Sequence, residues 1–258
     1  MTTTTQYNGR LCNQIIRNLA VSKIAEKNDL FVEYSSYEEI KQLGIDLFIG
    51  TQKYDKTIPL TDNNYFLIYD KTIHYNLNPN KDYFQTNEII QILYKHIQSV
   101  KNTIINNNPF KERYQKNNDV CLHVRLTDAL QFNPGVQYYL DTLSSLTFDK
   151  LYLTTDDPGH SIITQILQKY PRAILFNLNE VQTIQFASTC KYVVLSNGSF
   201  SAVIGYLAFF STVYYSKIDP KRIWHGDMFS IPGWKEVSPP ALTPRPLLGK
   251  RFFFNMPR

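Results

Sequence analysis

Residues 120–128 read VCLHVRLTD, and this stretch decides the predicted fold class. Three apolar residues alternate with three others along it: Val120, Leu122 and Val124 with Cys121, His123 and Arg125. This alternation predicts a β-strand that carries polar side chains at its carboxyl end. In an open α/β sheet, ligands bind beyond the carboxyl ends of the strands. The Arg125 guanidinium would suit a phosphate or diphosphate there, although a surface ion pair with Asp128 explains the stretch equally well.

The second half of the chain alternates regularly between predicted strands and helices. We expect strands at 120–125, 150–154, 173–176, 192–195 and 212–215, and helices at 135–146, 159–169, 181–189 and 199–209. Short connections between alternating strands and helices are typical of a parallel, doubly wound sheet.

The sequence of the first half predicts a less regular alternation of strands and helices. Apolar spacing indicates helices at 15–28 and 88–105 and a strand at 30–34, whereas residues 35–81 show no clear pattern. The polar segment 106–118, broken by Pro109, reads as the link between the halves. We therefore expect an α/β protein with two Rossmann-like domains facing across a cleft. The predicted boundaries are 1–115, 116–236 and a C-terminal tail at 237–258.

Composition narrows the function classes. The 258 residues are 43% hydrophobic and 19% charged, which is typical of a globular protein. The net charge of +5 is scattered, which disfavours a nucleic-acid-binding arm and suits a small anionic ligand. Three widely spaced cysteines argue against a disulfide framework or a zinc knuckle. The N-terminus shows no signal-peptide pattern, and no apolar run reaches the ~18–20 residues that a membrane span needs, so we expect a cytoplasmic protein, soluble or peripheral to a membrane.

Residues 9–14 (GRLCNQ) form a Gly-led polar segment directly before the first predicted helix. Such a loop presents backbone N–H groups and the positive end of a helix dipole to an anion. Asn13 and Gln14 would add orienting hydrogen bonds. A simple capping turn would have a similar sequence.

Two further polar segments follow predicted strands. In 153–158 (LTTDDP), one of Asp156 and Asp157 would cap the next helix, and the other could accept paired hydrogen bonds from guanine N1–H and N2–H₂. In 195–207 (LSNGSFSAVIGYL), a turn at Ser199 and Ser201 could offer hydroxyl and backbone N–H groups to a phosphate, unless the serine is only an N-cap.

His123 could hydrogen-bond a base or phosphate, but a lone histidine is more commonly a satisfied core residue. The chain has no D-x-D triplet, so the sequence does not support a metal-bridged diphosphate of that type.

The order of these motifs resembles the fucosyltransferase superfamily, and most of all its α-1,2-fucosyltransferase family. That family carries G-R-L-G-N-Q, H-x-R-R-x-D, S-D-D and S-N-S-x-F-S motifs; the matching stretches are residues 9–14, 123–128, 155–157 and 196–201. Tyr138, Tyr139 and the region from Trp224 to Trp234 also occur where such families place similar residues. The resemblance spans about residues 8–235.

This resemblance implies a GT-B fold and metal-independent, inverting transfer of fucose from GDP-fucose to a glycan hydroxyl, with no cofactor. It implies that Arg125 holds the donor diphosphate. It also implies that His123 and one of the paired aspartates hold the guanine end. The candidate site comprises Arg125 and Asn13 as catalytic residues and Gly9, Arg10, His123, Asp156, Asp157, Asn197, Ser199, Phe200 and Ser201 as donor-binding residues, with no metal ligand. Cys12 replaces the loop glycine and Leu126 the second arginine of the family pattern. A transferase for another nucleotide deoxysugar and a non-catalytic nucleotide- or sugar-binding protein remain alternatives, and the sequence does not predict an oligomeric state.

Overall fold

Strand β5 (Val120–Val124) lies inside the sheet of the C-terminal half, as the sequence predicts. The computed structural model describes residues 1–6, 9–217 and 226–238. Within them this sheet has six parallel strands in the order β10-β9-β8-β5-β6-β7. The other strands are β6 (Leu151–Thr155), β7 (Ile174–Leu175), β8 (Tyr192–Val194), β9 (Thr212–Ser216) and β10 (Lys235–Val237). The helices are α6 (Val136–Ser144), α7 (Ser161–Lys169), α8 (Glu180–Ala187) and α9 (Ser199–Leu207), with a short 3₁₀ turn at Leu130–Phe132.

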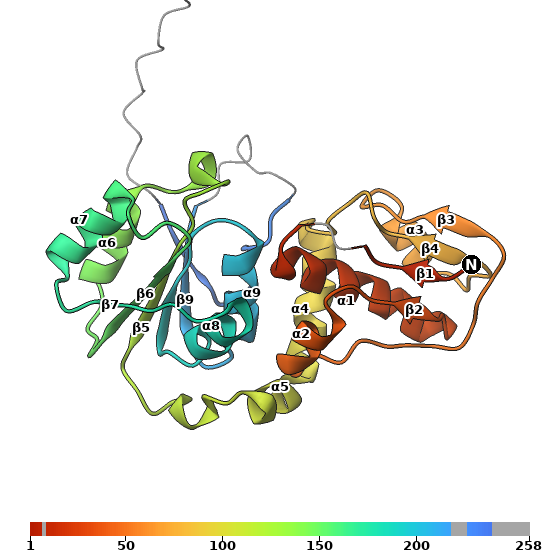
Figure 1. Ribbon diagram of the computed structural model, residues 1–258, viewed down its shortest axis with the longest axis horizontal. Coiled ribbons are helices and arrows are strands. Elements are labelled where there is room, and N and C mark those ends of the chain that lie inside the picture. The colour runs from red at the N-terminus through yellow and green to blue at the C-terminus, as the bar shows by residue number, and fades with distance from the viewer. Residues whose placement is uncertain (7–8, 218–225, 239–258) are drawn as a thin grey trace, which may run out of the picture.

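The chain winds in both directions from β5. It first runs outward through α6, β6, α7 and β7, then returns through α8 to β8 on the other side of β5 and continues through α9 to β9. Helices α6 and α7 contact each other, as do α8 and α9. Figure 1 shows the two pairs on opposite faces of the sheet. The predicted doubly wound parallel sheet is therefore confirmed.

The N-terminal half is also α/β, but its described strands are short and form two parallel pairs, β1 with β2 and β3 with β4. Its elements are β1 (Thr3–Thr4), α1 (Leu11–Asn28), β2 (Val32–Glu33), α2 (Tyr37–Gln42), β3 (Thr57–Pro59), α3 (Tyr65–Tyr69), β4 (Asn76–Asn78), α4 (Asn87–Ser99) and α5 (Lys101–Asn107). A 3₁₀ turn at Lys111–Arg113 lies in the segment that leads to β5. Figure 1 shows the two α/β halves side by side, so the predicted GT-B-like arrangement of facing parallel α/β units is confirmed.

Three predicted boundaries need correction. Helix α1 begins at Leu11 rather than at residue 15, because Leu11 and Cys12 are buried and join the apolar face of the helix. The predicted helix 88–105 is two helices that meet at Val100, whose backbone leaves the helical region (φ −105°, ψ 12°). Strand β10 was not predicted, and it crosses the expected boundary between residues 236 and 237. Asn8, Trp224 and residues 239–258 of the predicted tail lie outside the described residues.

The apolar core runs continuously between the halves. Helix α9 contacts α1 and α4 of the N-terminal half. Met228 and Phe229, which lie between β9 and β10 in the chain, are buried in the same core. The Tyr206 hydroxyl of α9 donates to the Met228 carbonyl at 2.8 Å. This shared core holds the N-terminal half close to one end of the sheet.

Three further features concern an apolar run, membrane-spanning helices and the cysteines. The stretch 204–215, the longest apolar run, forms the end of α9 and most of β9, as predicted. Among the described residues no helix combines the length and the apolar character that a membrane crossing needs. Cys12, Cys121 and Cys190 are buried and unpaired.

Candidate functional site

The direction of winding places a crevice between β5 and β8. The chain leaves β5 toward one edge of the sheet and leaves β8 toward the other, so the loops beyond their carboxyl ends diverge. Ligands of doubly wound sheets bind at such a switch point. A cleft of about 230 Å³ lies there, and both halves of the chain line it. Its lining residues are Gly9, Arg10, Cys12, Asn13, Tyr83, Gln85, Arg125, Asp128, Ala129, Asn197, Gly198, Ser199, Phe200 and Met228.

The alternation of β5 orients its functional side chains. Val120, Leu122 and Val124 pack in the core formed with α6 and α7, whereas Cys121 packs on the opposite face. Because successive strand residues point to opposite faces, His123 lies on the Cys121 face, toward α9. Arg125, two residues later, lies just beyond the strand and lines the cleft.

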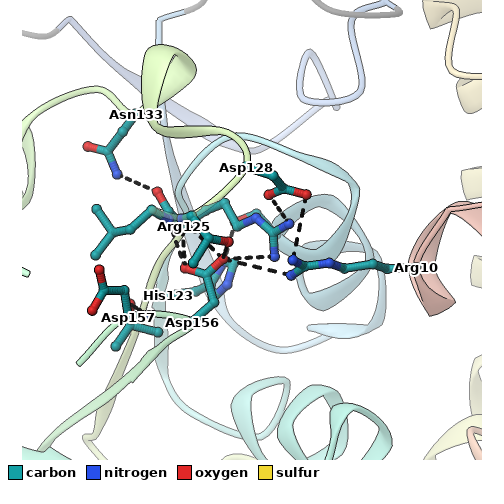
Figure 2. A network of polar contacts seen from close by, with 11 residues as sticks. Arg10, His123, Arg125, Asp128, Asn133, Asp156 and Asp157 are labelled. Atoms are coloured by element: carbon teal, nitrogen blue, oxygen red, sulfur yellow. Dashed lines mark hydrogen bonds and ion pairs between the residues drawn. The ribbon is translucent and has the colours of Figure 1, made fainter. Parts of the chain in front are cut away.

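The strand register brings Arg125 and Asp156 together. Val124 pairs with Thr155 in the parallel ladder, so the next residue of each strand also lies side by side. Arg125 Nη1 and Asp156 Oδ2 are 3.1 Å apart. The Arg125 side chain is 14% exposed and that of Asp156 18%. The same guanidinium forms an ion pair with Asp128, so the ion pair expected from the sequence is present (Figure 2).

Arg10 adds a second guanidinium from the N-terminal half. Its nitrogens lie 3.6 Å from Asp128 Oδ2 and 3.7 Å from Asp156 Oδ2. Figure 2 shows Arg10 reaching the same two carboxylates as Arg125 from the opposite side. Two cations and two anions therefore meet at the cleft and join the halves across it.

Asp156 is tied to the loop that follows β5. Its carboxylate accepts hydrogen bonds from Leu126 N (2.8 Å), Thr127 N (3.4 Å) and Thr127 Oγ1 (2.5 Å). Burial raises the pKa of Asp156, but the bonds from Thr127 and Leu126 and the charge of Arg125 outweigh it, so the pKa lies below its usual value. The observed contacts of this aspartate are with the chain itself.

Asp157 lies on the far side of Asp156 from Arg10 (Figure 2). Its Oδ1 accepts from Gly159 N at 3.1 Å, in the turn before α7. The expectation that one of the two aspartates caps this helix is wrong, because the N-cap is His160, whose Nδ1 accepts from Ile162 N at 3.2 Å.

His123 is buried and held by α9. Its Nδ1 lies 2.6 Å from Ser201 Oγ, and its ring lies 5.1 Å from that of Phe200. Burial, with a smaller contribution from the charge of Arg125, lowers the pKa of His123 to about 3, so the imidazole is neutral at physiological pH. These contacts match the alternative of a satisfied core histidine that the sequence analysis left open. They also engage the Ser201 hydroxyl, which was predicted to contact a phosphate.

The N-terminus of α9 opens onto the cleft. Its N-cap is Gly198, whose φ of 106° is unfavourable for other residues, and no side chain caps the helix. The alternative of a plain serine N-cap is therefore wrong, since Ser199 is the first helical residue. Ser199 and Phe200 line the cleft, as does Asn197, whose side-chain amide donates to the Phe132 carbonyl. An uncapped N-terminus here favours a bound anion.

The predicted N-terminal loop is largely the first turn of α1. Arg10 is the N-cap, and no side chain caps this helix either. Gly9 (φ 79°) and Asn13 line the cleft. Asn13 Oδ1 accepts from Gln85 Nε2 at 2.9 Å, and Gln14 Nε2 donates to the Gly9 carbonyl at 3.2 Å.

The two departures from the family pattern have structural explanations. Cys12 lies within α1, and glycine is unfavourable inside a helix. Its buried side chain belongs to the core and also lines the cleft. Leu126 is buried in the core beneath the sheet, on the α6 side. The two guanidiniums that line the cleft are those of Arg10 and Arg125.

Asn133 helps to position the site but was not singled out from the sequence, and Tyr139 was noted only as part of the resemblance. Asn133 Nδ2 donates to the Arg125 carbonyl (2.8 Å) and to the Tyr139 hydroxyl (2.9 Å), and Tyr139 donates to Ser196 Oγ (2.9 Å). These bonds tie the loop after β5 to the loop after β8. Asp128 was expected only as the ion-pair partner of Arg125. Thr127 stands inside a quoted motif and could have been considered, whereas Tyr83 and Gln85 had no motif to reveal them.

Other features complete the survey of sites. Within residues 1–6, 9–217 and 226–238, no three His, Cys, Asp or Glu side chains are grouped so that they could hold a metal ion. A larger, more open hollow of about 530 Å³ lies between α2, α5 and α8 and contains none of the predicted site residues.

Comparison with known proteins gives little beyond this geometry. No family model matches the chain, and no curated protein matches it. Among solved structures, the chain is similar to E. coli heptosyltransferase WaaC with ADP-2-deoxy-2-fluoro heptose, at 10% identity and a TM-score of 0.48, with 92% of this chain and 93% of that chain covered. WaaC with ADP gives 12% identity and a TM-score of 0.45 over 93% and 94% of the chains. Likeness at this level carries no conclusion about function.

Proposed function

We propose that this protein is a glycosyltransferase that binds a nucleotide-sugar donor in the cleft between its halves. The observation that carries the proposal is the meeting of two guanidiniums with the uncapped N-terminus of α9 at one cleft. Arg125 comes from the C-terminal half and Arg10 from the N-terminal half. Paired guanidiniums and free helix N–H groups are the groups that hold a diphosphate.

The same arrangement supports chemistry at the diphosphate. During transfer, an acceptor hydroxyl attacks the anomeric carbon and passes its proton to water or to the leaving diphosphate, while the bond from that carbon to the β-phosphate oxygen breaks. Negative charge then develops on the leaving nucleoside diphosphate. Arg125, Arg10 and the α9 N-terminus would stabilise that charge, and preorganised groups of this kind contribute strongly to catalysis. Asn13, at the wall of the cleft, would orient the acceptor or the β-phosphate.

For the donor we propose GDP-fucose, with inverting, metal-independent transfer to a glycan hydroxyl in an α-1,2 linkage. This finer assignment rests on the resemblance of the four motifs to α-1,2-fucosyltransferases. Of the two aspartates that could hold guanine, we favour Asp157, because its carboxylate accepts one hydrogen bond, from Gly159 N, whereas Leu126 and Thr127 both donate to the Asp156 carboxylate.

The engagement of Asp156 also favours a second candidate. If guanine lacks a carboxylate partner, the cleft could serve a different nucleotide deoxysugar with the same diphosphate contacts. A non-catalytic nucleotide- or sugar-binding protein is the remaining alternative, and turnover distinguishes it.

The test is a turnover assay with GDP-fucose and with UDP- and dTDP-linked deoxysugars, each with a mixture of glycan acceptors. We expect acceptor-dependent release of GDP and a fucosylated product by mass spectrometry. Arg125→Ala should abolish both, whereas Arg172→Ala, which removes an exposed arginine from the turn before β7, should not. Binding of GDP without turnover of any donor would favour the non-catalytic protein, and a preference for UDP- or dTDP-sugars would remove GDP-fucose as the donor.

A further inference from the structure

The two carboxylates that face Arg10 and Arg125 differ in how firmly the chain holds them. Asp156 accepts hydrogen bonds from two backbone N–H groups and a hydroxyl in addition to its ion pairs. Among the described contacts, Asp128 has the two guanidiniums as its only partners. Asp128 is also 51% exposed, against 18% for Asp156. Asp128 can therefore leave the arginines at small cost, and Asp156 cannot.

Asp128 occupies the place that an anionic ligand would take. Its carboxylate contacts Arg125 and lies 3.6 Å from Arg10, and all three residues line the cleft (Figure 2). A carboxylate and a phosphate oxygen use the same donors of a guanidinium. A diphosphate that takes the Nη2 donors of both arginines must displace Asp128 from them.

We propose that Asp128 is a built-in counter-ion that competes with the nucleoside diphosphate for Arg10 and Arg125. The inference rests on the proposed function, because it takes a nucleoside diphosphate as the ligand. In the empty cleft Asp128 neutralises the arginines and holds Arg10 across the cleft. When a diphosphate binds, the half-exposed carboxylate turns into water, where its solvation replaces much of the lost ion pair. Its return to the arginines after transfer lowers the affinity for the product and accelerates product release.

The direction of the effect separates this role from a supporting one. If Asp128 served to position Arg125 for the ligand, its removal would weaken binding. If it competes, its removal tightens binding. Asp128→Asn keeps the shape of the side chain and removes the charge, so it distinguishes the two roles.

The experiment is calorimetric titration of GDP and of inorganic pyrophosphate into the wild type, Asp128→Asn, Asp128→Glu and Asp149→Asn, with dissociation rates from stopped flow. We expect Asp128→Asn to bind both ligands about threefold to tenfold more tightly, with slower release. Asp128→Glu retains the charge and should stay close to the wild type. Asp149→Asn removes one exposed negative charge just before the amino end of β6, whereas Asp156 follows its carboxyl end. This variant controls for net charge.

Each outcome decides the matter. Tighter binding by Asp128→Asn alone supports the inference. Equal or weaker binding by Asp128→Asn, with GDP binding intact in the wild type, overturns the inference and leaves the proposed function standing. The same gain in Asp149→Asn would reduce the effect to net charge and also overturn it. Failure of every variant and the wild type to bind either ligand would overturn the proposed function together with the inference.

Discussion

Asp156 should contribute more to the stability of the fold than its neighbour Asp157, although both follow β6. The Asp156→Ala substitution removes the acceptor for Leu126 N at 2.8 Å and for Thr127 Oγ1 at 2.5 Å, and it removes the 3.1 Å ion pair with Arg125. A hydrogen bond typically contributes about 0.5–1.5 kcal/mol, and one to a charged group about 1.5–3 kcal/mol. These contributions are not additive, so we expect a net loss of about 2–4 kcal/mol. For a chain of this size that loss lowers the Tm by roughly 5–12 °C.

The matched control is Asp157→Ala. It removes a single hydrogen bond, from Gly159 N at 3.1 Å, which is exposed to solvent and therefore screened, so the loss should be only about 0.5–1.5 kcal/mol. Because the folded pKa of Asp156 is depressed, its contribution is fully present above the usual value of 3.8 and is lost as the pH falls through the folded pKa. The difference between the wild type and Asp156→Ala should therefore shrink below about pH 4.

Urea unfolding of the wild type and both alanine variants at pH 7 and pH 3 measures these free energies. Equal losses for the two variants at pH 7 would refute the role given to Asp156. An undiminished difference between the wild type and Asp156→Ala at pH 3 would refute its electrostatic explanation.

Three further expectations concern metal, base and histidine. EDTA should leave transfer unchanged, as the missing D-x-D triplet suggests, and a strict need for added Mn²⁺ or Mg²⁺ would contradict this. If Asp157 pairs with guanine N1–H and N2–H₂, GDP should bind about tenfold or more tightly than IDP by calorimetry, and Asp157→Ala should erase most of the difference. Equal affinity of the wild type for both nucleotides would remove the guanine assignment. Because the folded pKa of His123 lies near 3, below its usual 6.5, its contribution to stability is complete above pH 6.5 and falls as the pH drops toward 3. His123→Asn should thus lose less unfolding free energy than the wild type between pH 7 and pH 4.5, and parallel losses would contradict this.

The C-terminal sheet could be predicted from the sequence because its signals are local. Apolar alternation within β5 and short polar connections fix each strand and its face to within one or two residues. The strands of the N-terminal half have two or three residues each, too few for a period to be recognised. The break at Val100 carries no glycine or proline, and β10 is a short strand with two exposed residues, so neither had a sequence signal.

Only part of the predicted set of residues lines the cleft. Gly9, Arg10 and Asn13 meet Arg125 there, as do Asn197, Ser199 and Phe200. His123, Asp156, Asp157 and Ser201 do not line it. Which aspartate meets Arg125 depends on the register of β6 against β5, and that register places Asp156 beside Arg125. The reach of Arg10 across the cleft is a long-range side-chain contact that no local pattern encodes.

The central claim is that Arg125 holds the diphosphate of a nucleotide ligand in the cleft. Titration of GDP into the wild type, Arg125→Ala, Arg125→Lys and Arg172→Ala at one fixed salt concentration tests it most directly. We predict that Arg125→Ala binds at least about tenfold more weakly, because charge-assisted hydrogen bonds worth roughly 1.5–3 kcal/mol are lost. Arg125→Lys should recover little of that affinity, because an ammonium cannot form the bidentate contact, and Arg172→Ala should bind as the wild type does. Wild-type affinity for GDP in Arg125→Ala would contradict the account.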